Sequence, residues 1–462
     1  MLIRTQRYLG SWHGWPGIDS GDLHPIADRW SVCQSGRRGW WSWHRLIALC
    51  VSAALLLCPA DASGCSQDPQ AHQAHDENGA APPPEFELVP IGKADAVPSR
   101  HSAAYDQTRS LLPPEFREHE TRRFIVLSNA PLQTTRIQAR RLERTYHQFQ
   151  RFIRRLGIES RPLEHKLICV LFDDREEYRA FASAHDGVSD PWIAGYYSPA
   201  HDRVVFYQGG ANPSVVEARG ILDRMEMEVR AIGAEADAAR RSGLEQQAQA
   251  LRDYQQQYQT HLQGERDRVE TFAQQVEVAT TLHEAFHQLM FHTGVQSDRV
   301  RYPLWISEGL ATAFETDDPD SPFGPDRDYA PRRAAFEEVL TNNWLFGLRD
   351  LVSWNSVPSP DELAVYTLYH QSYALVTWLW HTRRPALREY LELMREQPAP
   401  DMTAQQYQQL FERVFGDIES LESSWLHQER VKLSERLARE VSPEVANSVV
   451  STTTTDGKQL RR

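Results

Sequence analysis

The sequence has little cysteine. Five cysteines occur in 462 residues, and four of them lie within the first 65 residues. The fifth, Cys169, lies inside an apolar run over residues 167–172, which favours a small buried core residue over a reactive thiol. These positions exclude a disulfide framework for the remainder of the chain.

The sequence also lacks an overall excess of basic residues. Asp and Glu outnumber Lys and Arg by 63 to 50, which gives a formal net charge of -13. Because acidic residues predominate over the whole chain, we expect no nucleic-acid partner. The negative charge favours solubility and argues weakly against anionic surfaces as partners.

The apolar run over residues 46–58 is too short to cross a bilayer as a helix. It follows Arg37 and Arg45 and precedes the small residues Ala60 and Ala62, which is typical of a secretory signal peptide. We therefore expect residues 1–65 to be a signal or targeting region and the protein to be exported to the periplasm, the cell surface or the medium. A lipid anchor at Cys65 is the alternative to simple cleavage, and it would be the only attachment to a membrane.

Three further regions follow from composition and periodicity. Residues 66–118 are rich in Pro, Ala, His and acidic residues, which predicts a disordered tether. Residues 119–430 hold β-rich runs followed by a series of helical patterns, which predicts the folded domain. Residues 431–462 are polar and predict a C-terminal tail.

Residues 211–264 differ from the rest of this domain. They are rich in Gln, Glu, Arg and Ala, and a helical pattern of apolar residues is interrupted at Ser242 and Gly243. This pattern predicts an antiparallel helical hairpin inserted into the domain. The hairpin is either a lid or partner-binding arm, or a solvated spacer.

The strongest chemical signal is the sequence HEAFH over residues 283–287. On a helix, His283 and His287 lie one turn apart on the same face, so both imidazoles can reach one metal ion. Imidazole and carboxylate ligands suit zinc, and Glu284 is placed to act on a metal-activated water. Gly294 follows as a helix-ending residue. The motif also arises by chance, and the two histidines are then ordinary helix residues.

A second motif, WISEGLATAFE, covers residues 305–315. Together with HEAFH it resembles the gluzincin metallopeptidases, and specifically their peptidase MA-like branch, which includes exported bacterial proteins. The resemblance spans residues 122–425 apart from the hairpin, and only the two motifs are specific. It implies that Glu308 is the third zinc ligand, although a glutamate early in a helix is otherwise a solvated residue.

The resemblance implies a zincin-like α+β fold, with a small mixed sheet, an edge strand over the cleft and a mostly helical lobe. It also implies zinc-dependent hydrolysis of a peptide or protein substrate, with Glu284 as general base. Tyr369, in the sequence Tyr-His-Gln-Ser, is the expected donor to the oxyanion, and Tyr373 is a further candidate. Either tyrosine can instead pack in the core.

Three other positions are secondary candidates. Glu315 either supports a metal ligand or is exposed. Gly195 and Tyr197 lie on an expected strand, which either binds an extended peptide through its backbone or is an ordinary hairpin. His292 is expected to be a bystander.

Two other functions remain open on the sequence. The chain can be a catalytically silent zinc-binding protein of the cell surface, although an intact Glu284 argues against a purely binding role. It can also be a zinc hydrolase of a non-peptide amide.

Overall fold

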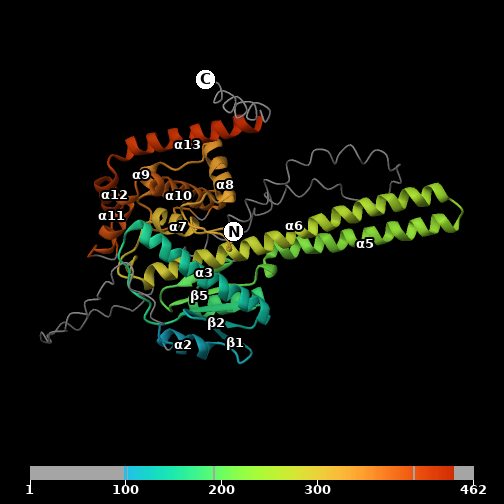
Figure 1. The fold of residues 1–462 in the computed structure, drawn as a ribbon, viewed down its shortest axis with the longest axis horizontal. Helices are drawn as coiled ribbons and strands as arrows, with labels where there is room; N and C mark the ends of the chain where they lie inside the picture. The colour runs from blue at the N-terminus through green and yellow to red at the C-terminus, as the bar shows by residue number, and fades with distance from the viewer. Residues whose placement is uncertain (1–97, 101, 191–192, 360, 399–400, 442–462) are drawn as a thin grey trace, which may run out of the picture. The chain divides into compact units, whose positions relative to one another are not determined.

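The computed structural model describes residues 98–100, 102–190, 193–359, 361–398 and 401–441 (Figure 1). The expected signal region, the Cys65 anchor, most of the tether and the end of the C-terminal tail lie outside these residues. None of the helices formed by the described residues combines the length and the apolar character that a membrane span requires.

The sheet is small and mixed, as expected. Its five strands have the order β1-β2-β3-β5-β4, with β2, β3 and β5 parallel and the two edge strands antiparallel to their neighbours. The strands are β1 (Arg117–Glu120), β2 (Phe124–Ser128), β3 (Leu167–Phe172), β4 (Gly195–Ser198) and β5 (Arg203–Tyr207). The α+β class is therefore confirmed.

The central strands are buried on both faces because their sequences are uninterrupted runs of apolar residues. Alternate residues belong to different cores. Phe124 and Val126 pack in the larger core, whereas Ile125 and Leu127 pack in a smaller core on the opposite face. Cys169 is a buried free cysteine of the larger core, and burial raises the pKa of its thiol.

Helices cover both faces of the sheet. The longer α3 (Leu132–Leu156) contributes apolar residues to the larger core, and α4 (Arg175–Phe181) contributes to the smaller one. The remaining short elements near the sheet are α2 (Ala103–Leu111), the π-helical turn η2 (Ala182–Asp186) and the 3-10 turn η3 (Gly209–Ala211).

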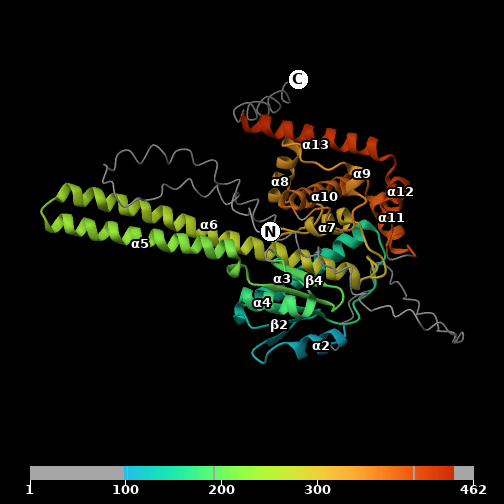
Figure 2. The same ribbon diagram turned by 180° about the vertical axis from the view of Figure 1, so that it is seen from behind.

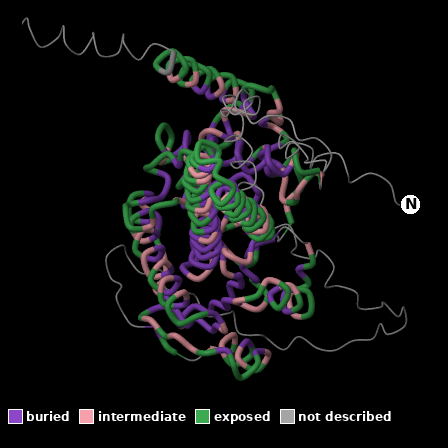
Figure 3. The backbone as a smooth tube through the Cα atoms, turned by 90° about the vertical axis from the view of Figure 1, so that its right-hand side faces the viewer, coloured by how far each residue is buried: buried purple, intermediate pink, exposed green. Residues whose placement is uncertain are grey.

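Helices α5 (Pro213–Arg241) and α6 (Glu245–His292) lie side by side as an antiparallel pair (Figures 1 and 2). The chain reverses at Gly243, whose φ of 76° is left-handed. The expected hairpin is not a separate insertion, however. Helix α6 continues for 48 residues without a break and carries the HEAFH motif near its end. Its outer part is largely exposed in Figure 3, whereas residues 278–290 are buried.

The C-terminal helices surround a buried central helix, α10 (Glu362–Thr382), in which every residue from Val365 to Trp380 is buried. Helices α7 (Leu304–Thr312) and α8 (Ala330–Thr341) pack on it. Both α7 and α10 contribute to the larger core, so one continuous apolar core joins the sheet to this helical part. The other helices are α9 (Leu348–Leu351), α11 (Arg384–Arg395), α12 (Ala404–Phe415) and α13 (Ile418–Val441).

Two expected boundaries differ from the structure. Helix α2 and strand β1 lie at the end of the expected tether, where the REHE sequence of β1 carries no apolar signal. Leu112 and Phe116 anchor this segment in the smaller core, and the Tyr105 hydroxyl donates a hydrogen bond to Glu118 at 2.7 Å. At the other end, α13 continues to Val441, beyond residue 430, and Arg436 forms an ion pair with Glu337.

Substitution of Gly309 on α7 tests how closely α7 and α10 must pack. A Cβ atom added there would lie 2.6 Å from the backbone oxygen of Ser372, so Gly309→Ala should lower the free energy of unfolding by about 1–3 kcal/mol. Gly264→Ala is the matched control, because Gly264 is an exposed position of α6 with no atom near an added Cβ. The control should raise stability by about 0.5–1 kcal/mol. Urea denaturation checks both, and equal stability of the two variants would contradict the packing.

Candidate metal centre

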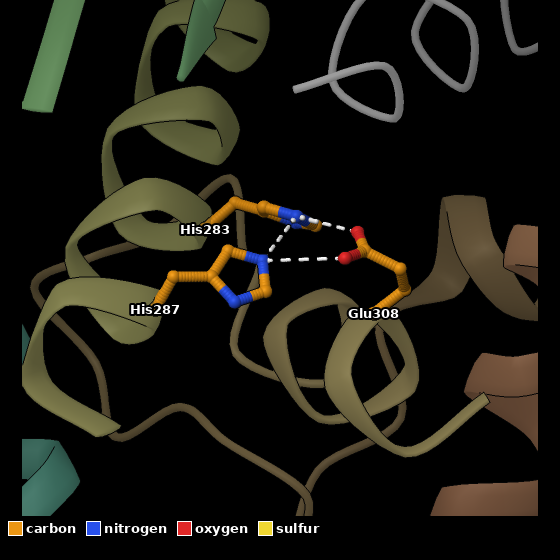
Figure 4. Close-up of side chains that lie close together, drawn as sticks. All are labelled: His283, His287 and Glu308. Atoms are coloured by element: carbon orange, nitrogen blue, oxygen red, sulfur yellow. Dashed lines mark hydrogen bonds and ion pairs between the residues drawn. The ribbon is translucent and has the colours of Figure 1, made fainter. Parts of the chain in front are cut away.

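Three side chains from two helices meet at one buried point (Figure 4). His283 and His287 extend from α6, and their Nε2 atoms are 3.1 Å apart. Glu308 extends from α7, with Oε2 at 3.3 Å from His283 Nε2 and Oε1 at 3.7 Å from His287 Nε2. All three side chains are completely buried. The structure thus brings together the three residues that the sequence proposes as metal ligands.

Local sequence explains how Glu308 comes to be buried. Helix α7 begins after Pro303, and Trp305 packs against Tyr390 and Phe411 in the apolar core. Gly309, directly after Glu308, allows the backbone of α7 to approach that of α10. The glycine of the WISEG sequence therefore has a packing role, and it fixes the position of the neighbouring carboxylate.

The spacing of the three groups fits a tetrahedral metal ion. Ligand atoms about 2.0–2.2 Å from a tetrahedral zinc ion are about 3.3–3.6 Å from one another. The observed separations of 3.1, 3.3 and 3.7 Å are close to these values. Two imidazoles and one carboxylate also form the donor set of catalytic zinc sites. The residues present therefore fit a divalent ion.

The electrostatics of the cluster also favour a cation. Burial lowers the pKa of His283, but hydrogen bonds with Glu308 and Glu315 outweigh this effect and raise the pKa to about 10. Burial and the neighbouring His283 hold the pKa of His287 well below its usual value. Without a metal, one proton on His283 therefore supplies the positive charge that the carboxylates require.

Glu315 orients the first imidazole. Its Oε1 lies 3.0 Å from His283 Nδ1, so a proton on Nδ1 leaves Nε2 free to face the cluster. Glu315 lies just beyond α7, which ends at Thr312 and is followed by a turn. Nδ1 of His287 has no hydrogen-bond partner among the described residues. Of the two histidines, only His283 thus has a carboxylate partner on its Nδ1 atom among the described residues.

Arg332 is a site residue that the sequence does not reveal. It lies at the start of α8, is 1% exposed, and binds Glu315 through Nε at 2.6 Å and Nη2 at 2.8 Å. Its Nη1 also lies 3.5 Å from Nδ1 of His370 on α10. Arg332 lies outside both motifs, and no pattern in the sequence marks it as a residue of the site. The paired contacts with Glu315 neutralise a buried carboxylate that would otherwise compete for the charge of His283.

Glu284 points toward the edge of the sheet. Its Oε2 accepts a hydrogen bond from the backbone N–H of Tyr197 on β4 at 2.9 Å, and its Oε1 has no partner among the described residues. Burial raises the pKa of Glu284 to about 8. One oxygen of this carboxylate is therefore held in place while the other remains available to a bound molecule.

Strand β4, for which peptide binding and an ordinary hairpin were both open, is an edge strand of the sheet. All four of its residues are buried, and the N–H of Tyr197 is already bonded to Glu284. Gly195 allows β4 to contact α6, since a Cβ there would lie 2.6 Å from the side chain of Thr280. The strand thus positions Glu284, and it presents no open surface along which a peptide would lie.

The structure separates the two candidate tyrosines. Tyr369 is completely buried on α10, and burial followed by the charge of Glu308 holds its pKa well above the usual value. Its hydroxyl lies near Glu308 but makes no well-formed hydrogen bond within the described part of the chain. Tyr373 lies outside the cluster, because its hydroxyl accepts the N–H of Tyr329 at 2.9 Å. His292, the expected bystander, contacts Asp202 in the β4–β5 turn.

The comparisons with known proteins identify no activity. Residues 277–400 match a family described as "Protein of unknown function (DUF1570)". The matched stretch contains His283, Glu284, His287, Glu308 and Tyr369. It contains no part of α5, and of α6 before the motif it contains only residues 277–282. No curated protein matches the chain.

Proposed function

We propose that this protein is a zinc-dependent peptidase related to the gluzincins, with His283, His287 and Glu308 as the metal ligands. The observation that carries the proposal is the convergence of these three groups, at the spacing of a tetrahedral zinc site, beside a carboxylate with one uncommitted oxygen. The antiparallel edge strand β4 beside α6 supports the zincin-like form of the fold.

A zinc ion held there would polarise a scissile carbonyl and lower the pKa of a water molecule toward about 7. Glu284 accepts the proton of the attacking water through its free Oε1 and returns it to the departing amine. A divalent cation beside this carboxylate lowers its pKa, so the group is ionised at neutral pH. The N–H of Tyr197 keeps the second oxygen in position throughout.

Tyr369 is the donor that we assign to the developing oxyanion. Its buried hydroxyl has no other well-formed bond, and its high pKa keeps it protonated, so the hydrogen remains available for donation. Glu315 and Arg332 hold the ring of His283 and do not touch the reacting atoms. Since every one of these side chains is buried, a substrate reaches them only after neighbouring elements separate.

The same burial favours a second candidate function, that of a zinc-binding protein without catalysis. Glu284 is completely enclosed and already accepts a backbone bond from Tyr197. In a purely structural site, zinc would join α6 to α7 and stabilise the fold. A substitution at Glu284 separates the two functions.

Glu284→Gln should retain zinc and lose peptide cleavage, because the amide cannot accept the proton. We expect kcat to fall by about 10²–10⁴. Hydrolysis of a mixed peptide library, with metal content measured on the same samples, checks this. Glu270→Gln is the control, since Glu270 is an exposed carboxylate on the same helix. Equal cleavage by wild type and Glu284→Gln would end the peptidase proposal, and no cleavage by either would favour the binding protein.

Glu308→Gln should reduce zinc affinity because it replaces the only anionic ligand with a neutral amide. The purified wild-type chain should hold one equivalent of zinc, and a chelator should lower both its metal content and its melting temperature. Elemental analysis and calorimetry measure these quantities. A wild-type chain that holds no zinc after incubation with the metal, or a melting temperature unchanged on loading, would contradict the site.

Glu315→Gln keeps all three ligands but weakens the bond that orients His283. Zinc affinity should fall by about 10–100-fold, measured by competition with a chelator of known affinity. The variant also leaves Arg332 without its carboxylate partner, so its folding is checked by circular dichroism. A folded Glu315→Gln variant with unchanged zinc affinity would show that this contact has no role in metal binding.

A further inference from the structure

Helix α3 carries a stripe of basic residues along its outer side. The helix contains seven arginines but only one acidic residue, Glu143. With 3.6 residues per turn, positions 136, 140, 147, 151 and 154 all fall within about 60° of one direction and extend over about 27 Å. We call this set the basic stripe. Its members are all exposed, and they are Arg136, Arg140, His147, Arg151 and Arg154.

The arginines of the basic stripe have no acidic partner among the described residues. Arg136, Arg140 and Arg154 form no ion pair within the described residues, and Arg151 bonds only the neutral Gln148. Nearby acidic groups are already engaged. Glu143 binds Arg123 at one border of the stripe, and Asp320 and Asp326 pair with Arg144 and Arg155 at the other.

The α5–α6 pair shows that this arrangement is not general to the exposed helices of the chain. There, basic and acidic residues alternate and pair with one another, as in Arg219–Glu270, Arg230–Glu226 and Arg252–Asp237. The chain as a whole has a net charge of -13. A row of unpaired arginines on such a protein produces a local positive potential that attracts an anionic partner.

The chemistry of the stripe restricts the class of partner. The tyrosine and both phenylalanines of α3 are buried, so His147 is the one ring of this helix left to stack on a nucleic-acid base, which disfavours a nucleic-acid partner. The apolar side of α3 packs in the protein core, so the helix cannot insert that side into a lipid surface. The five members of the basic stripe are spaced by about 5–11 Å along the helix, which suits a polymer with roughly one charged group per sugar.

We propose that the basic stripe binds an acidic polysaccharide that carries carboxylate, phosphate or sulfate groups. Guanidinium groups bind such oxyanions through paired hydrogen bonds, and the row on α3 lets one extended chain contact several arginines at once. This binding is independent of the metal centre. It gives the protein an anionic partner that its overall net charge alone does not predict.

Binding of the full chain to a heparin oligosaccharide of defined length tests the proposal, by fluorescence anisotropy at low and at higher salt. The double variants R136Q/R140Q and R151Q/R154Q should each weaken binding by about tenfold or more. Their affinity should also depend less steeply on salt than that of the wild type, because fewer counterions are released. All substituted residues are exposed, so the fold should be unaffected, which circular dichroism checks.

The control variant is R240Q/R241Q, at the exposed end of α5, which changes the net charge equally and should leave the affinity unchanged. Phosphatidylglycerol vesicles and a single-stranded oligo(dT) serve as competing anionic probes and should bind more weakly than heparin. Failure of the wild type to bind heparin at low salt would overturn the proposal. An equal loss in the control, or tighter binding to the vesicles or to oligo(dT), would overturn it as well.

Discussion

The burial of two carboxylates beside two imidazoles is the constraint on which the centre of this molecule depends. A buried carboxylate without a positive partner is costly, and Glu308 and Glu315 are both buried. Arg332 neutralises Glu315, whereas the ion-pair partners of Glu308 among the described residues are the two histidines. A proton on His283 satisfies this arrangement in part, and a divalent ion between the three groups would satisfy it more completely. The charge balance and the spacing of the ligands therefore both favour a divalent metal ion between these three groups.

The scaffold holds this arrangement through close contacts between elements that are distant in sequence. Helix α6 extends from the α5–α6 pair into the core and carries both histidines, while α7 brings Glu308 to them. Gly195 lets the edge strand approach α6, and Gly309 lets α7 approach α10. As a result, Glu284 is fixed by the backbone of β4, and Glu308 is fixed by the packing of α7. A change in the β4–α6 contact or in the α7–α10 contact would change the geometry of the site.

Helical spacing was sufficient to predict that His283 and His287 share one face, whereas Glu308 followed from the resemblance of the WISEG sequence to the gluzincins. The central strands were equally predictable from their apolar runs. Strand β1 was not, since its REHE sequence contains no apolar residue and the strand is defined by its pairing with β2. Arg332 was not predictable either, because its role depends on how α8 packs beside the turn after α7. The burial of β4 likewise arises from tertiary packing against α6, which a four-residue strand does not encode.

The most direct test of the account is X-ray absorption spectroscopy at the zinc edge of the purified, zinc-loaded protein. We predict a first shell of nitrogen and oxygen atoms at about 2.0–2.2 Å, with the multiple-scattering signal of two imidazoles and no sulfur. Replacement of His287 by alanine should remove one imidazole from that shell. A shell without imidazole scattering, or one that contains sulfur, would contradict the assignment of His283, His287 and Glu308 as the metal ligands.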